Sequence, residues 1–225
     1  MQNKVLIKIS PPLWPIFDIE IEILKKELNQ QKEVTIITCN GKKNFCIANE
    51  KMSKIKCSFC KLRLKKGINI LNRKQNKIKI IDENINYKLP KNLNKIIKIK
   101  KFHDLKKIKF KGIDFGQSIA SSLATQYKTE NIDARKNDVL IKELFIQSLS
   151  SYYFFKDLFL KNKYHKYLIY NGRIYNYRPL LRFGQQKKLN LYCYDYHYFS
   201  HNRYLIRKLD FTQNIHLRAN EIYNI

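Results

Sequence analysis

The chain has 225 residues, 44% of them hydrophobic and 28% charged, and its 45 Lys and Arg against 18 Asp and Glu give a formal net charge of +27. A chain of this length and apolar content buries a core without disulfides, which excludes a disordered tail. An uncharged run near the middle, residues 144–155, is too short and too polar to span a bilayer. The first residues lack the apolar run of a signal peptide, so we expect a cytoplasmic protein with reduced cysteines.

The positive charge is concentrated in one part of the chain. Residues 1–41 carry five basic and five acidic groups, whereas residues 42–111 carry 23 basic and 4 acidic groups, a net +19. Such a stretch predicts a polyanionic partner, and a solvated lysine surface is the alternative. Lys outnumbers Arg by 36 to 9. This ratio favours an anionic membrane surface over nucleic acid, whose recognition prefers the planar guanidinium group.

The first forty residues predict the opening of an α/β domain. Residues 5–9 are a short, mostly apolar run that predicts a strand, and apolar residues recur at helical spacing over residues 17–30. Residues 34–38 are apolar enough to predict a second strand, buried on both faces. A strand, a helix and a strand in about 35 residues form a parallel βαβ unit.

The rest of the chain predicts further elements of the same kind. A cysteine-bearing loop leads into a helix near residues 59–71, and short alternating runs such as 78–81 and 96–99 follow. We expect helices at 119–127, 139–159 and 174–185, and strands at 166–170 and 189–193. The predicted fold is therefore α/β: one Rossmann-like domain over residues 1–225, with a mostly parallel sheet flanked by helices. We also expect strands 34–38 and 166–170 to be neighbours and to open onto a shared pocket.

Four of the five cysteines lie within 22 residues, at Cys39, Cys46, Cys57 and Cys60. The two-residue gap between the last pair lets both sulfurs reach one ion, and two more thiolates complete a tetrahedral shell. The pattern predicts a structural zinc site, with an iron–sulfur cluster as the alternative. Basic neighbours are expected to favour the thiolate form. Four reduced thiols without a metal are the plainer interpretation.

A second candidate site is Asn171-Gly172-Arg173, directly after the predicted strand 166–170. In open α/β sheets, ligands bind beyond the carboxyl ends of the strands. A tight turn at this position would place the amide and the guanidinium over such a crevice. The alternative is an ordinary turn in which Gly172 supplies an unusual backbone angle.

Two helix starts supply the remaining candidates. Gly116, Ser121 and Ser122 lie at the start of a predicted helix, where small residues can hold a phosphate or sugar hydroxyls. Helix capping is the plainer role there. Glu20 and Glu22 are acid–base candidates in the first helix, although their spacing points them in different directions. The usual motifs of nucleotide-hydrolysing enzymes, dehydrogenases, serine hydrolases and zinc proteases are absent from the sequence.

Taken together, these residues resemble a bacterial family of capsular and surface polysaccharide biosynthesis proteins of the GT-B glycosyltransferase type. The matching pieces are spread over about residues 5–220: Glu20 with Glu22, the run 34–41, Cys46 with Asn49, Cys57 with Cys60 and Arg63, Gly67, the run 112–116, Ser121 with Ser122, and Asn171-Gly172-Arg173. The chain departs from the family pattern at Gln31, where a Gly is usual, and at Ile16 and Phe17, where a His is frequent. That His would be a natural general base.

The resemblance implies transfer of a sugar from a nucleotide-sugar donor to a glycan acceptor, at the inner membrane face. The chain corresponds to the N-terminal, acceptor-side domain, and the C-terminal donor domain is expected on a separate chain. Asn171 and Arg173 would orient the substrate, and the catalytic base is not identified. An inactive fragment, a split-gene product and a degenerate copy stay open as alternatives. The rival function is that of a basic, zinc-containing nucleic-acid-binding protein.

Overall fold

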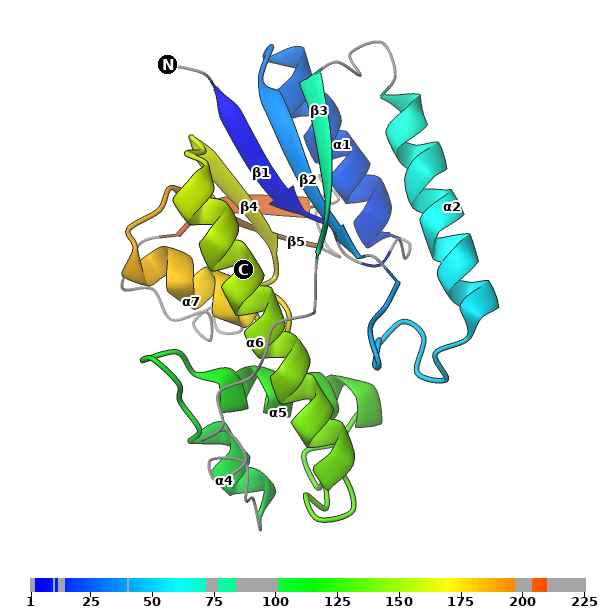
Figure 1. Ribbon diagram of the computed structural model, residues 1–225, viewed down its shortest axis with the longest axis vertical. Coiled ribbons are helices and arrows are strands. Elements are labelled where there is room, and N and C mark those ends of the chain that lie inside the picture. Colours follow the sequence, from blue (N-terminus) through cyan, green and yellow to red (C-terminus); the bar gives the residue numbers. More distant parts are fainter. Residues whose placement is uncertain are drawn as a thin grey trace, which may run out of the picture.

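The computed structural model describes residues 3–9, 11, 15–39, 41–71, 77–83, 101–196 and 204–209. A six-stranded sheet in the order β3-β2-β1-β4-β5-β6 forms its centre (Figure 1). The strands are β1 (Lys4–Lys8), β2 (Glu33–Cys39), β3 (Ile78–Glu83), β4 (Lys166–Tyr170), β5 (Leu191–Tyr196) and β6 (Tyr204–Lys208). The first five pair in parallel, and β6 runs antiparallel to β5. The predicted α/β, Rossmann-like fold is confirmed.

Helices cover both faces of the sheet (Figure 1). They are α1 (Ile16–Asn29), α2 (Lys54–Ile70), α4 (Phe102–Lys106), α5 (Phe115–Tyr127), α6 (Asp138–Lys161) and α7 (Arg178–Gln186). Successive residues of a strand point to opposite faces. Val5 and Ile7 therefore join the core formed with α1, while Leu6 joins the larger core formed with α5, α6 and α7.

The order of the strands creates a crevice at their carboxyl ends. The chain runs from β1 outward to β2 and β3, and then returns to place β4 on the other side of β1. The place between β1 and β4, where the strand order reverses, is called a topological switch point. The connections that follow the two strands leave it in opposite directions, and ligands of open α/β sheets bind in the crevice between them. The strands predicted at 34–38 and 166–170 both belong to the sheet, but they are not neighbours, because β1 lies between them and pairs with both.

Most predicted elements are present, with shifted ends. The helix expected over 174–185 begins at Arg178, and Pro179 occupies its first turn, where the missing amide hydrogen costs nothing. The helix expected near 59–71 begins at Lys54, because the Ser53 hydroxyl accepts a hydrogen bond from the Lys56 amide and caps it. The sequence did not predict α4 or β6, and the run at 96–99 lies outside the described residues. Within the described ranges, no helix is both long and apolar enough to cross a membrane.

Gly116 gives a direct test of the packing between α4 and α5. A Cβ added there would lie 1.8 Å from the Leu105 carbonyl oxygen, so the two helices can approach only where residue 116 has no side chain. We expect Gly116→Ala to lower the free energy of unfolding by about 1–3 kcal/mol. Urea unfolding measures this as a lower midpoint at unchanged slope. Ser121→Ala, on the half-buried side of the same helix, is the control and should stay within about 0.5 kcal/mol.

Candidate ligand-binding crevice at the carboxyl ends of the strands

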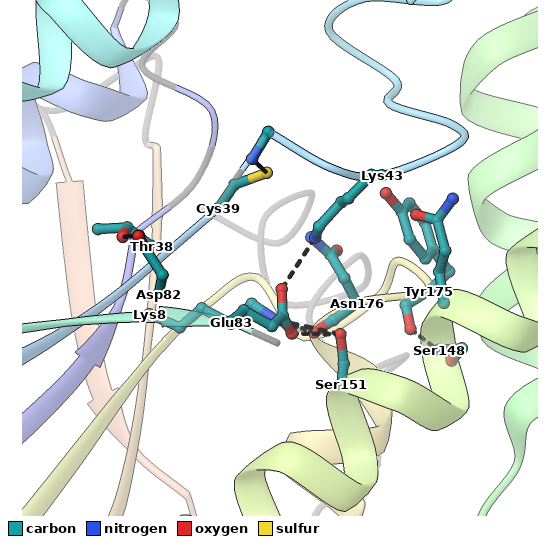
Figure 2. A network of polar contacts seen from close by, with 12 residues as sticks. Lys8, Thr38, Cys39, Lys43, Asp82, Glu83, Ser148, Ser151, Tyr175 and Asn176 are labelled. Carbon is teal, nitrogen blue, oxygen red and sulfur yellow. Dashed lines mark hydrogen bonds and ion pairs between the residues drawn. The ribbon is translucent and has the colours of Figure 1, made fainter. Parts of the chain in front are cut away.

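Three charged side chains converge at the carboxyl edge of the sheet (Figure 2). Lys8 ends β1, Glu83 ends β3, and Lys43 lies in the loop after β2. Lys8 Nζ is 2.6 Å from Glu83 Oε1, and Lys43 Nζ is 2.9 Å from Glu83 Oε2. All three side chains are at most 7% exposed, so this cluster is screened from water.

Helix α6 and the loop after β4 complete the shell around the cluster. The Ser151 hydroxyl donates to Glu83 Oε1 at 2.5 Å, and Lys8 Nζ contacts the same hydroxyl at 3.3 Å. Lys8 Nζ also donates to the backbone carbonyl of Asn176 at 3.1 Å. The protons of Lys8 are therefore directed at three protein acceptors, while Lys43 donates to the other oxygen of Glu83.

The cluster holds one more positive charge than negative charge. Burial disfavours the Glu83 carboxylate, but Lys43 and Lys8 outweigh it and hold the pKa of Glu83 well below its usual range. Burial lowers the pKa of Lys8 to about 8, and repulsion from Lys43 acts in the same direction. Burial would lower the pKa of Lys43 as well, but attraction to Glu83 raises it above its ordinary value. A buried group with net charge +1 favours an anion as its neighbour.

Serines of two helices fix the loop that carries Tyr175. The Tyr175 amide donates to the Ser122 hydroxyl at 2.9 Å, and the Ser148 hydroxyl donates to the Tyr175 carbonyl at 2.5 Å. Burial raises the pKa of Tyr175, so its phenol stays protonated beside Lys43 and can donate a hydrogen bond. The loop therefore presents a fixed, neutral donor next to a buried cation.

Two adjoining cavities lie over the cluster and together form what we call the crevice. The inner cavity measures about 150 Å³ and is lined by Lys8, Lys43, Glu83, Tyr175 and Asn176, among others. The outer cavity measures about 360 Å³ and shares five residues of its wall with the inner one: Pro11, Cys39, Lys43, Cys46 and Ala48. Asn176 Oδ1 is buried in this wall without a hydrogen-bond partner among the described residues. An unused acceptor of this kind is suited to a donor from water or from a ligand.

The four clustered cysteines all line the outer cavity, and the zinc site expected from their spacing stays a prediction. Among the residues that the structure describes, no three His, Cys, Asp or Glu side chains form a group that could hold a metal ion. Burial raises the pKa of Cys46, and it raises that of Cys60 to about 11, aided by the neighbouring cysteines. Lys43 lowers the pKa of Cys46 and Lys61 lowers that of Cys60, as expected of basic neighbours, but burial outweighs both. Cys57 accepts a hydrogen bond from the Asn49 side chain, and Cys39 accepts one from the Gly41 amide.

Asn171-Gly172-Arg173 follows β4 as predicted, but its polar groups face another element. The Asn171 amide nitrogen donates to Asp195 on β5 at 2.8 Å, and Arg173 Nε donates to Asn171 Oδ1 at 2.6 Å. Asn171 and Gly172 both have positive φ, which the turn requires. None of the three lines the crevice, whose wall includes the flanking Tyr170 and Ile174 instead.

The other predicted site residues support the fold around the crevice. Glu20 is fully buried in α1 and accepts a hydrogen bond from the Tyr194 hydroxyl at 2.8 Å. Gly116 permits close packing, as described above, and Ser121 is half-buried on α5. Ser122 acts on the crevice indirectly, because its hydroxyl accepts from the Tyr175 amide; the same hydroxyl donates to the Ser118 carbonyl.

No sequence motif singles out Lys8, Lys43 or Glu83. One signal was present: Lys8 interrupts an apolar strand that is otherwise buried on both faces, and a buried lysine requires a partner. Nothing local identifies Glu83 as that partner, because 75 residues separate the two in the sequence.

Comparisons with known proteins leave the family open. No protein-family model matches the chain, and no curated protein matches it. Among solved structures, a cyclodipeptide synthase (CDPS) from Fluoribacter dumoffii aligns over 92% of this chain and 91% of its own, at 15% identity and a TM-score of 0.42.

This result corrects the predicted function. The aligned structure is a CDPS and not a glycosyltransferase, and neither of the other comparisons supports sugar transfer or capsule biosynthesis. The arrangement of the site agrees with the correction, because Asn171 and Arg173 do not line the crevice. At this TM-score the likeness does not transfer the activity of the CDPS to this chain.

Removing the shared carboxylate tests the buried cluster. In Glu83→Gln, two buried ammonium groups lose their counter-ion, so we expect the free energy of unfolding at pH 7 to fall by about 3–5 kcal/mol. Glu130→Gln is the control, because Glu130 is 75% exposed and its ion pair with Lys106 contributes less than about 1 kcal/mol. Equal effects of the two substitutions in urea unfolding would show that Glu83 does not stabilise the fold as the shared counter-ion of the two lysines.

The ionised carboxylate of Glu83 also predicts how the free energy of unfolding changes at acid pH. The folded-state pKa of Glu83 lies below its unfolded value near 4.5, so its stabilisation is complete above that value and is lost as the pH falls below it. We expect the stability difference between the parent protein and Glu83→Gln to shrink from pH 6 to pH 3. A difference that stays constant over this range in urea unfolding would exclude an ionised Glu83.

Proposed function

We propose that the protein binds a small organic anion in the crevice, with the anionic group beside Lys43. The observation that supports this most strongly is the sharing of Glu83 by two buried lysines at the switch point of the sheet. The cluster has a net positive charge that the described protein groups around it leave uncompensated, and an anion would balance it. The neutral phenol of Tyr175 adds a hydrogen-bond donor at the same place.

The sizes and linings of the two cavities suggest which part of the ligand each of them holds. The inner one has the volume of only a few non-hydrogen groups, so it suits the anionic group alone. The outer one is lined by the apolar Ala48, Met52 and Phe59, which suit an organic body. Lys56, Lys61 and Arg63 also line the outer cavity and favour a ligand with more than one negative charge. A phosphorylated metabolite has all of these properties.

The predicted association with the inner face of a membrane stays a proposal. Its support is the charge of the described residues 42–71, which contain nine Lys and Arg and one acidic residue. An anionic leaflet attracts such a surface, and the attraction weakens within a Debye length.

Thermal unfolding with inorganic phosphate and with pyrophosphate tests anion binding. A ligand at ten times its Kd should raise the Tm by about 3–6 °C, measured against chloride at the same ionic strength. Lys43→Gln should abolish the rise, and it should still fold, because Glu83 keeps its pair with Lys8. Lys187→Gln, an exposed lysine after α7, is the matched control and should keep the rise. An equal rise in both variants would contradict the site.

The pH dependence of binding gives a second test. Because the pKa of Lys8 is about 8, the cluster loses its excess positive charge as the pH rises above 8. We expect the affinity for sulfate, which stays a dianion throughout this range, to fall between pH 7.5 and pH 9.5 when measured by calorimetry. An affinity that is unchanged over this range would show that the buried charge does not hold the ligand.

A further inference from the structure

Helix α2 exposes an apolar face to solvent. Ile55, Phe59, Leu62 and Ile70 are 70%, 65%, 47% and 79% exposed. Residues four and three apart lie on one side of a helix, so Ile55, Phe59 and Leu62 form a continuous stripe. The opposite side packs on the protein, where Gly67 and Ile68 are buried, and α2 lies at the edge of the molecule (Figure 1).

Basic residues surround this stripe. The sequence of α2 contains six Lys and Arg and no acidic residue: Lys54, Lys56, Lys61, Arg63, Lys65 and Lys66. All six are exposed. At 3.6 residues per turn, Lys54, Lys61 and Lys65 lie on one flank of the stripe and Lys56 and Arg63 lie on the other, while Lys66 lies within it. The helix therefore presents an apolar stripe between two basic rows.

We infer that this face of α2 docks on an anionic membrane surface. Lipid headgroups attract the basic rows, and the aliphatic and aromatic side chains enter the boundary between headgroups and acyl chains. The helix has 17 residues and lies along the protein surface, so it is suited to rest in the plane of the interface. This inference names the partner surface of the proposed membrane association, and it does not depend on the ligand of the crevice.

The charges and the apolar stripe together disfavour other occupants. A second copy packed face to face would bring twelve basic side chains together without an acidic partner on either helix. A nucleic acid would attract the basic rows, but its phosphate backbone offers nothing to cover Ile55, Leu62 and Ile70. An anionic leaflet satisfies both features at once.

Docking by α2 would bring the crevice close to the lipid headgroups. Lys56, Phe59 and Arg63 belong to α2 and also line the outer cavity. The membrane-facing helix thus forms part of the wall of the proposed ligand site. A ligand that enters or leaves by the outer cavity would do so next to the membrane surface.

Vesicle co-sedimentation of the full chain tests the inference. We expect binding to vesicles of 70% phosphatidylcholine and 30% phosphatidylglycerol, little binding to pure phosphatidylcholine, and weaker binding in 0.5 M than in 0.1 M NaCl. The double substitution Phe59→Ser, Leu62→Ser should lower the partition coefficient on the order of 100-fold. Val139→Ser with Leu160→Ser is the matched control, because it removes two exposed apolar side chains from α6, and it should leave binding unchanged.

Charge substitutions separate the basic rows from the total charge. Lys54→Gln, Arg63→Gln and Lys66→Gln together should weaken binding on the order of 100-fold. Arg135→Gln, Lys136→Gln and Lys187→Gln remove the same charge from exposed positions outside α2 and should have a much smaller effect. Equal losses from both triple variants, or binding independent of the lipid charge, would overturn the inference.

Two other measurements on the same variants have outcomes that would overturn membrane docking by α2. A dimer that dissociates in the Phe59→Ser, Leu62→Ser variant in analytical ultracentrifugation would assign the face to a second copy. Binding to single-stranded nucleic acid that is lost in the α2 variants, without vesicle binding, would assign it to nucleic acid. Pyrophosphate binding is measured separately, so failure of vesicle binding leaves the crevice proposal standing.

Discussion

The shared use of one carboxylate by two buried lysines organises the carboxyl edge of this sheet. Glu83 joins the end of β3 to Lys8 at the end of β1 and to Lys43 in the loop after β2, while Ser151 attaches the same carboxylate to α6. Lys8 extends the connection to the loop after β4 through the Asn176 carbonyl. Removing the carboxylate leaves two ammonium groups buried and unpaired, so the edge depends on Glu83.

The same arrangement gives the edge its chemical character. Two cations and one anion leave a net positive charge in a place that is screened from water, next to cavities with apolar walls. A purely structural ion pair would be neutral, and the second lysine therefore requires a separate explanation. An anionic ligand supplies one. The basic face of α2 adds a second positively charged surface beside the outer cavity, so both features favour the binding of anions.

The sequence was sufficient to predict the layers of the fold, but not the site. Apolar runs such as 34–38 and 166–170 become strands because a parallel sheet buries both faces, and that pattern is local. The order of the strands is not local, which is why β1 was not expected between them. Lys8 and Glu83 depend on a contact across 75 residues. Asn171 and Arg173 lie after a strand as predicted, but their side chains bond to each other and to Asp195, which no motif shows. The cysteines share a cavity wall, yet spacing alone does not determine whether thiols meet at a metal ion.

A double-mutant cycle between Lys8 and Glu83 tests the central claim most directly. The free energy of unfolding would be measured for the parent protein, Lys8→Met, Glu83→Gln and the double variant. Lys8→Met leaves Lys43 and Glu83 as a neutral pair, and Glu83→Gln leaves two buried cations without a counter-ion. In the double variant only Lys43 remains, and it lines the cavity, so the loss of Glu83 costs less once Lys8 is absent. Our account predicts that the double variant is more stable than the sum of the single effects implies, with a coupling energy of about 1.5–3 kcal/mol. Additive effects, within about 0.5 kcal/mol, would show that the two side chains do not depend on each other and would contradict it.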